Sequence, residues 1–170
     1  MDKAMMPPTA RHDLVELLGT VSRAMTQSPV AVSPEAPVSV ALAILEERAV
    51  GGAPVVQGGR VVGVVTIADL VGGRTSAQHT GPPLRPNHEA RDWSVADVMT
   101  ETAVVASAGE PLVAAVLRMD EARVDRIPVV GPDGRPIGIL ARDDVVRAVA
   151  RAARHGGTGG TEPRPLLLPD

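Results

Sequence analysis

The sequence predicts an α+β fold in which two βαββα repeats pack through their sheets with pseudo-two-fold symmetry. Short motifs recur at a fixed spacing, and each copy has the same order of strand-like and helix-like segments. The Met-Thr pair of residues 25–26 recurs at residues 99–100, and the Pro-Val-Val of residues 54–56 recurs at residues 128–130, both 74 residues later. A unit of about 55 residues is only marginally stable alone, because it buries little surface. We therefore expect the two copies to clasp each other.

Each repeat is predicted to begin with a short strand, at residues 30–32 and 103–105, followed by a helix that starts near a proline. Proline suits the first turn of a helix because its missing N–H would have no partner there. The apolar residues after each proline follow the i, i+3, i+4, i+7 spacing of one helix face. They are Val38, Ala41, Leu42 and Leu45 in the first repeat and Leu112, Ala115, Val116 and Met119 in the second.

A hairpin and a second helix complete each repeat. The apolar segments APVV and VVGVVT flank the turn QGGR, and IPVV and PIGIL flank GPDGR, which contains the Asp-Gly pair favoured in hairpins. The turn of the second repeat is one residue longer, so the spacing becomes 75 from Gly63 to Gly138. The segment DDVVRAVARAAR then predicts a helix.

These patterns divide the chain into five parts. The repeats cover residues 20–72 and 94–152. Residues 1–19 form an N-terminal segment with a helix, and residues 73–93 form a flexible linker rich in glycine, proline and polar groups. Residues 153–170 are of low complexity and are expected to be disordered.

The composition excludes several classes of protein. The formal net charge is −3 without a basic run, and Phe and Tyr are absent, so the basic face and stacking platforms of a nucleic-acid binder are missing. No segment approaches the ~18 apolar residues of a membrane span, and no secretory signal is apparent. The absence of cysteine fits a reducing compartment. We expect a cytoplasmic protein with no membrane and no nucleic-acid partner.

The repeated motifs resemble a tandem pair of cystathionine-β-synthase-type (CBS) domains. The resemblance rests on the Met-Thr pair, the Pro-Val-Val strand and the Gly-x-x-x-x-x-Asp ending, each present twice in the same order. It implies a cytoplasmic regulatory module, commonly a homodimer, whose clefts bind an adenosine-containing ligand such as AMP, ADP, ATP or S-adenosylmethionine. The resemblance implies no catalytic activity and no required cofactor.

The family's ligand motif is met in full by Gly63-Val64-Val65-Thr66-Ile67-Ala68-Asp69. Free N–H groups at the start of a helix attract phosphate, Thr66 adds a hydroxyl there, and Asp69 can accept hydrogen bonds from a ribose diol. The alternative is structural, because Thr-x-x-Asp also forms a capping box that closes a helix end by itself. The two roles are compatible.

The second copy of the motif departs from this pattern, because Ala141 stands where the first has Thr66. Asp144 keeps the diol contact. Arg142 opposes the helix dipole in the first turn, so we expect it to pair with a bound phosphate or, as the alternative, with Asp143 or Asp144. The sequence thus predicts one conventional nucleoside cleft and one altered or weakened cleft.

The resemblance also implies an apolar slot for an adenine ring, beside the first strand and the Pro-Val-Val proline. The corresponding residues are Val30, Ala53 and Pro54 in one repeat and Ile127 in the other. Ordinary core packing is the alternative for each. Arg126 is expected to face solvent, with a phosphate contact as the alternative.

The predicted function is that of a stand-alone regulatory module that binds its ligand between the repeats and signals to an unknown effector protein. It is not an enzyme: no catalytic or nucleotide-loop motif is present. The alternative is a dimerisation or scaffold module with vestigial clefts.

Overall fold

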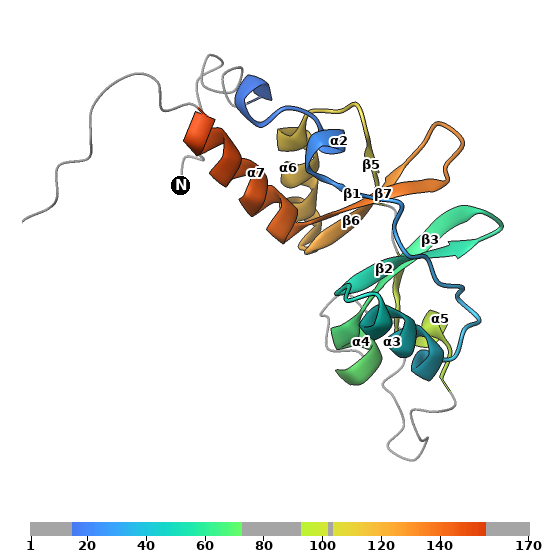
Figure 1. The fold of residues 1–170 in the computed structure, drawn as a ribbon. Coiled ribbons are helices and arrows are strands. Elements are labelled where there is room, and N and C mark those ends of the chain that lie inside the picture. Colours follow the sequence, from blue (N-terminus) through green and yellow to red (C-terminus); the bar gives the residue numbers. More distant parts are fainter. Residues whose placement is uncertain (1–14, 73–92, 102–103, 156–170) are drawn as a thin grey trace, which may run out of the picture.

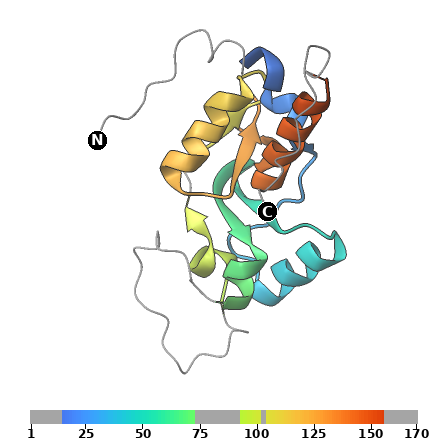
Figure 2. The ribbon, with the colours of Figure 1, turned by 90° about the vertical axis from the view of Figure 1, so that its left-hand side faces the viewer.

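The computed structural model describes residues 15–72, 93–101 and 104–155. Most of the predicted N-terminal segment, nearly all of the linker and most of the tail lie outside these residues. Figure 1 shows two halves, each consisting of a small sheet covered by helices. In Figure 2, turned by 90°, the helices lie toward opposite ends of the molecule and the strands lie between them. This is the α+β arrangement that the sequence predicts.

The first half is built around a three-stranded sheet of order β2-β3-β4. Strands β2 and β3 form the predicted hairpin. Helix α3 precedes it in sequence and α4 follows it, in the predicted order, and the two helices lie next to each other (Figure 1). The elements are α3 (Val38–Glu47), β2 (Gly52–Gln57), β3 (Arg60–Thr66), α4 (Ile67–Gly72), α5 (Val95–Val98) and β4 (Thr100–Glu101).

The second half has a four-stranded sheet of order β1-β7-β6-β5. Gly134 closes the β6–β7 turn with a φ of 79°, a left-handed conformation that glycine adopts without strain. The elements are α2 (Val21–Ala24), β1 (Thr26–Gln27), β5 (Ala106–Ser107), α6 (Leu112–Ala122), β6 (Arg126–Val130), β7 (Pro136–Ala141) and α7 (Arg142–His155).

The segment leading into each repeat pairs with the sheet of the other repeat. Strand β1 pairs antiparallel with β7, and β4 pairs antiparallel with β3. The short helix that precedes each of these strands packs in the same half as the strand. Val21 of α2 is buried in the core of the second half, and Val95 and Val98 of α5 are buried in the core of the first. The two halves are therefore joined by a reciprocal exchange of their leading segments.

The helix stripes predicted from the sequence are confirmed. Val38, Ala41 and Leu45 are buried in the first core, with Leu42 packed at its edge. The matching residues of α6 are buried in the second core, with Val116 at its edge. The helices begin one residue after Pro37 and Pro111, which occupy the N-cap position rather than the first turn.

The first strand predicted in each repeat is wrong in extent. Residues 30–32 contribute only a single parallel bridge, from Val32 to Val55, and in the second repeat the strand is β5, shifted to Ala106–Ser107. The reason lies in the facing strand. To extend the ladder toward residue 30 or residue 104, the residue at position 54 or 128 would have to donate its N–H, and both are prolines.

The two sheets contact each other along a seam where β3 meets β6 and β2 meets β7. Because β2 corresponds to β6 and β3 to β7 in the repeat, the pseudo-two-fold relation exchanges these two contacts. Within the described ranges, no helix is long and apolar enough to cross a membrane.

Candidate functional site

The first ligand motif forms a complete capping box at the junction of β3 and α4. The carboxylate Oδ2 of Asp69 accepts the backbone N–H of Thr66 at 2.8 Å and the Thr66 hydroxyl at 2.7 Å. The Asp69 N–H donates in return to the Thr66 hydroxyl oxygen at 3.2 Å. The structural alternative predicted for this motif is therefore present in the fold.

This capping box uses only one of the two carboxylate oxygens of Asp69. Both hydrogen bonds to Asp69 end on Oδ2, and no described residue donates to Oδ1. The residue is only 7% exposed. A carboxylate has about four lone-pair positions for hydrogen bonds, so Oδ1 remains an acceptor for a ligand hydroxyl while the cap stays intact.

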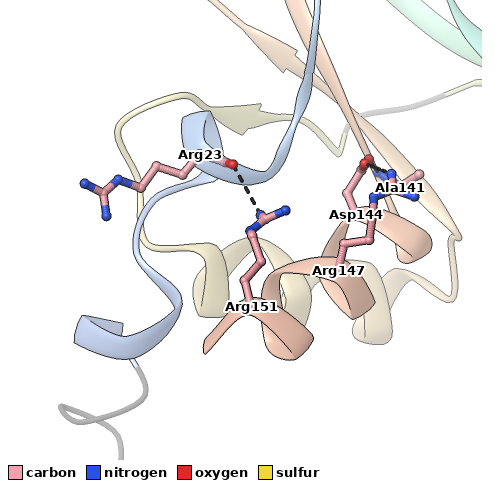
Figure 3. Close-up of polar contacts among 5 residues, drawn as sticks. All are labelled: Arg23, Ala141, Asp144, Arg147 and Arg151. Carbon is pink, nitrogen blue, oxygen red and sulfur yellow. Dashed lines mark hydrogen bonds and ion pairs between the residues drawn. The ribbon is translucent and has the colours of Figure 1, made fainter. Parts of the chain in front are cut away.

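The second motif uses its carboxylate differently, as Figure 3 shows. Asp144 Oδ2 accepts the backbone N–H of Ala141 at 2.8 Å, which matches the first motif. Its other oxygen, Oδ1, is engaged by the guanidinium of Arg147 in a hydrogen-bonded ion pair. Asp144 is 4% exposed. Both of its oxygens are therefore taken by groups of the chain itself.

Arg142 pairs with a residue that the sequence analysis did not consider. Its Nη2 lies 2.5 Å from Asp125 Oδ1, and its backbone N–H donates to the Asp125 carbonyl at 2.8 Å. Neither Asp143 nor Asp144 is its partner, so that alternative was wrong, and a contact of Arg142 with a bound phosphate stays a prediction. The backbone bond has an equivalent in the first repeat, from Ile67 to Gly51, and it brings residue 125 beside the start of α7. The sequence separation of the pair concealed this proximity.

The sequence did not predict the contact of Arg126 with the first half of the molecule. It was expected to face solvent, but its side chain crosses the seam and lies against Gly51 and Gly52 at the start of β2. A Cβ placed on Gly52 would stand 2.6 Å from Arg126 Nη1 and 2.7 Å from the Val65 carbonyl oxygen. The Nε atom is buried without a hydrogen-bond partner. The repeat contained a signal for this contact, because the residue of the first repeat that corresponds to Arg126 is the glycine Gly52.

Arg126 lies near the end of the first ligand motif because of the register of the hairpin. Gly52 is paired with Thr66 across β2 and β3, so the guanidinium lies beside the strand pair that ends in Thr66. The seam therefore brings together a hydroxyl and a carboxylate from the first half and a cation from the second. Such a combination suits a ligand that carries hydroxyl groups and an anionic group.

The residues predicted for the apolar slot are mostly part of the two cores. Ala53 is packed in the first core and Ile127 in the second. Pro54 is fully buried, and Val30 is partly exposed. Core packing, the alternative considered for these residues, is present for Ala53 and Ile127. A contact of any of them with a ligand ring stays a prediction.

Two cavities lie away from the carboxylates of Asp69 and Asp144. One, of about 280 Å³, lies between α6 and the start of α7 and includes Arg142. The other, of about 640 Å³, lies on the first half and includes Glu35, Gln57 and Glu101. Thr66, Asp69 and Asp144 line neither of them. Within the described part of the chain, no cluster of three or more histidine or acidic side chains is arranged to hold a metal ion.

The pKa of Glu35, beside the larger cavity, lies below its usual range. Hydrogen bonds from the Ser33 hydroxyl, from its own backbone N–H and from Gln57 stabilise the charged form, in that order of importance. The Gln57 amide donates to Glu35 Oε1 at 2.8 Å, across 22 residues of sequence. These bonds tie the loop before α3 to the end of β2.

Comparison with known proteins identifies both repeats. The family model described as CBS domain matches residues 19–74 and 95–151. The CBS domain-containing protein CBSX2 of Arabidopsis thaliana, a chloroplastic protein, is 32% identical over 146 residues, which cover 73% of this chain and 60% of that protein. An inosine-5'-monophosphate dehydrogenase of Thermoplasma acidophilum is 26% identical over 139 residues. That match covers 80% of this chain and 25% of the dehydrogenase, so the chain spans only part of either relative.

Solved structures share the fold. The crystal structure of CBSX2 in complex with AMP superposes with a TM-score of 0.61 at 31% identity, covering 79% of this chain and 98% of that chain. The CBS domain pair of protein MJ0100, solved with 5'-methylthioadenosine and S-adenosyl-L-methionine, superposes with a TM-score of 0.64 at 19% identity, covering 78% and 97%.

Proposed function

This chain belongs to the CBS domain family, and on that premise we propose that it is a regulatory module that binds an adenosine-containing ligand between its two repeats. It performs no turnover and requires no cofactor. Binding is read by a partner protein, in the cytoplasm, and the module acts as a homodimer. The chain is similar to the CBS portion of larger proteins, so the effector is a separate protein or a further domain.

One observation carries the proposal: Asp69 Oδ1 is an acceptor with no donor among the described residues, although the carboxylate is almost wholly buried. A vicinal diol supplies two O–H donors, and the lone pairs of Oδ1 can accept them. The Thr66 cap holds the group in place, because it uses only the other oxygen.

Arg126 supports an anionic substituent on that ligand. Its guanidinium lies beside the β2–β3 pair next to Thr66, and its buried Nε has no partner. A phosphate accepts several N–H donors of a guanidinium at once. AMP is the ligand held by CBSX2, which is 31% identical to this chain. We therefore place AMP first among the candidates, before ADP, ATP and S-adenosylmethionine.

The regulatory step follows from the position of the ligand on the seam. Asp69 and Thr66 belong to the first half and Arg126 to the second, so a ligand that contacts all three changes the relative free energies of the possible arrangements of the halves. It shifts that equilibrium only as far as its affinities for the two arrangements differ. A partner that binds one arrangement better then senses the ligand.

Thermal unfolding with AMP, ADP, ATP and S-adenosylmethionine tests the function. A ligand at one hundred times its Kd stabilises the folded state by about 2.7 kcal/mol. The Asp69→Ala variant should unfold at the same temperature with and without ligand. Asp97→Ala is a matched control, because Asp97 accepts the N–H and hydroxyl of Ser94 at 2.9 and 2.7 Å in the same kind of capping box, on α5. It should lose stability and keep the ligand shift.

The alternative function is a dimerisation scaffold whose clefts are vestigial. No thermal shift with any of the four compounds at millimolar concentration would favour it. Sedimentation of the ligand-free chain would then show a dimer whose association constant does not change on adding them.

A further inference from the structure

The two buried carboxylates of the ligand motifs differ in one contact. No described residue donates to Asp69 Oδ1, whereas Asp144 gives the same oxygen to Arg147. Arg147 lies one turn into α7, and the matching position in the first repeat is Gly72, which has no side chain to offer. The difference therefore arises from a side chain that only the second repeat has.

We propose that Arg147 closes the second cleft by occupying the acceptor that a ribose diol would use. The inference rests on the proposed function and goes further, because it names the residue that sets the number of ligands. The chain binds one nucleoside, at Asp69, and the site at Asp144 becomes available only when Arg147 is removed.

Both carboxylate oxygens of Asp144 already accept hydrogen bonds from the chain. Its Oδ2 accepts the Ala141 N–H at 2.8 Å, a bond that caps the start of α7. Its Oδ1 carries the ion pair with Arg147, and the residue is only 4% exposed. A diol that approaches this carboxylate must displace one of the two donors. The N–H belongs to the backbone at the helix start, so the displaced group is Arg147.

The exchange is unfavourable for a neutral ligand. An Arg–carboxylate hydrogen bond is charge-assisted and roughly twice as strong as a bond between neutral groups. A diol would replace it with neutral donors and would leave a buried charge without its counter-charge. Replacing such a bond weakens binding roughly 10- to 100-fold. No comparable exchange is required at Asp69.

The contact of Arg147 is specific to that arginine and is not a general property of the helix surface. Arg151, one turn further along α7, points toward α2 and donates to the Arg23 carbonyl oxygen at 3.4 Å (Figure 3). Arg147 instead points back along the helix to Asp144. Its side chain is 61% exposed, so it has room to swing into solvent when the pair is broken.

Arg147 also compensates for the hydroxyl that the second motif lacks. In the first repeat the Thr66 hydroxyl donates to the aspartate; in the second, Ala141 has no such donor, and Arg147 supplies one on the opposite oxygen. The compensation stabilises the folded protein by itself. A test must therefore use a measurement that a purely structural role would not change, and the number of bound ligands is such a measurement.

Isothermal titration with adenosine measures that number. Adenosine carries the diol but no phosphate. Because adenosine is neutral, the loss of the Arg147 charge in Arg147→Ala does not change its binding through attraction to a phosphate. We expect one equivalent for the unmodified chain, two for Arg147→Ala, and one for Arg151→Ala, the matched arginine of the same helix. The second equivalent should disappear in Arg147→Ala/Asp144→Asn. 2'-Deoxyadenosine, which lacks the vicinal diol, should bind weakly at both sites.

The variant Asp69→Ala separates this inference from the proposed function. It should bind no adenosine, and Asp69→Ala/Arg147→Ala should bind one equivalent, at Asp144. If the unmodified chain binds one equivalent and the double variant binds none, the role of Arg147 is refuted and the function stands. If the unmodified chain binds none and Arg147→Ala binds one, the function at Asp69 is refuted and the role of Arg147 stands. Two equal equivalents in the unmodified chain, or no binding in any variant, refute the inference.

Discussion

The sulfur of Met25, in the first repeat, lies against Gly138, in the second. A Cβ placed on Gly138 would stand 2.5 Å from that sulfur and 3.1 Å from the Thr26 carbonyl oxygen. The relation is reciprocal, because a Cβ on Gly63 would stand 2.8 Å from the Met99 sulfur and 2.8 Å from the Thr100 carbonyl oxygen. The repeated Met-Thr pair and the repeated glycine are thus two sides of one contact, made twice across the exchange of β1 and β4.

Gly138→Ala and Gly63→Ala should each destabilise the fold. The added methyl group meets a backbone carbonyl that is held in a strand pair, so β1 or β4 must shift. Overpacking of this kind costs about 1–3 kcal/mol. Chemical denaturation measures the loss. Gly109→Ala is the control, because a Cβ there would have no heavy atom within 4 Å. Equal stability of all three variants would contradict the exchange of β1 and β4.

Arg126→Ala should weaken AMP much more than adenosine. The guanidinium is the cation beside Thr66 and Gly52, and loss of a charge-assisted bond to phosphate lowers affinity roughly 10- to 100-fold. Titration of both ligands measures the difference. Arg135→Ala, which removes an exposed arginine paired with Asp133, should leave the affinity for both unchanged. An equal loss for AMP and adenosine in Arg126→Ala would remove Arg126 from the phosphate site.

Thr66→Ala should make the first motif resemble the second, without an arginine to compensate. Loss of a cap of this kind destabilises a protein by about 0.5–2 kcal/mol. The affinity for adenosine should fall as well, because Asp69 loses the hydroxyl bond that orients it. Thr66→Ser keeps the hydroxyl and should preserve both properties. Denaturation and titration of the two variants provide the comparison, and normal binding by Thr66→Ala would show that Asp69 is held without the cap.

Glu35 should titrate below the exposed glutamates of the chain, because Ser33, its own backbone N–H and Gln57 lower its pKa. A lowered pKa in the folded state means that the contribution of Glu35 to stability is full above its unfolded pKa. That contribution is lost as the pH falls through the folded value. Side-chain NMR titration measures the midpoint. Gln57→Ala should raise it and Ser33→Ala should raise it further; no change in either variant would contradict the role of these hydrogen bonds.

Arg142→Ala should change the free energy of unfolding by less than about 1 kcal/mol. The side chains of Arg142 and Asp125 are 72% and 66% exposed, and exposed ion pairs contribute about that much or less. Arg147→Ala should cost more, because its partner Asp144 is buried. Denaturation of both variants at neutral pH measures the contrast. Equal losses would mean that burial of Asp144 does not strengthen its ion pair.

The sequence predicted the parts of this protein that depend on local spacing. The helix stripe of Val38, Ala41 and Leu45 and the hairpin around Gly134 follow from residue periods and turn preferences. The repeat itself identified Thr66, Asp69 and Asp144 as a related set. It also showed, through Ala141, that the two motifs are unequal.

The tertiary structure decided which segments and side chains meet. Periodicity tells which face of a segment is apolar but not which sheet covers it, so the pairing of β1 with β7 and of β4 with β3 had no local signal. The prolines at 54 and 128 stop a ladder only once the facing strand is known. Long arginine side chains have many rotamers of similar energy. The positions of Arg126 over Gly52 and of Arg147 on Asp144 were therefore set by the surrounding fold.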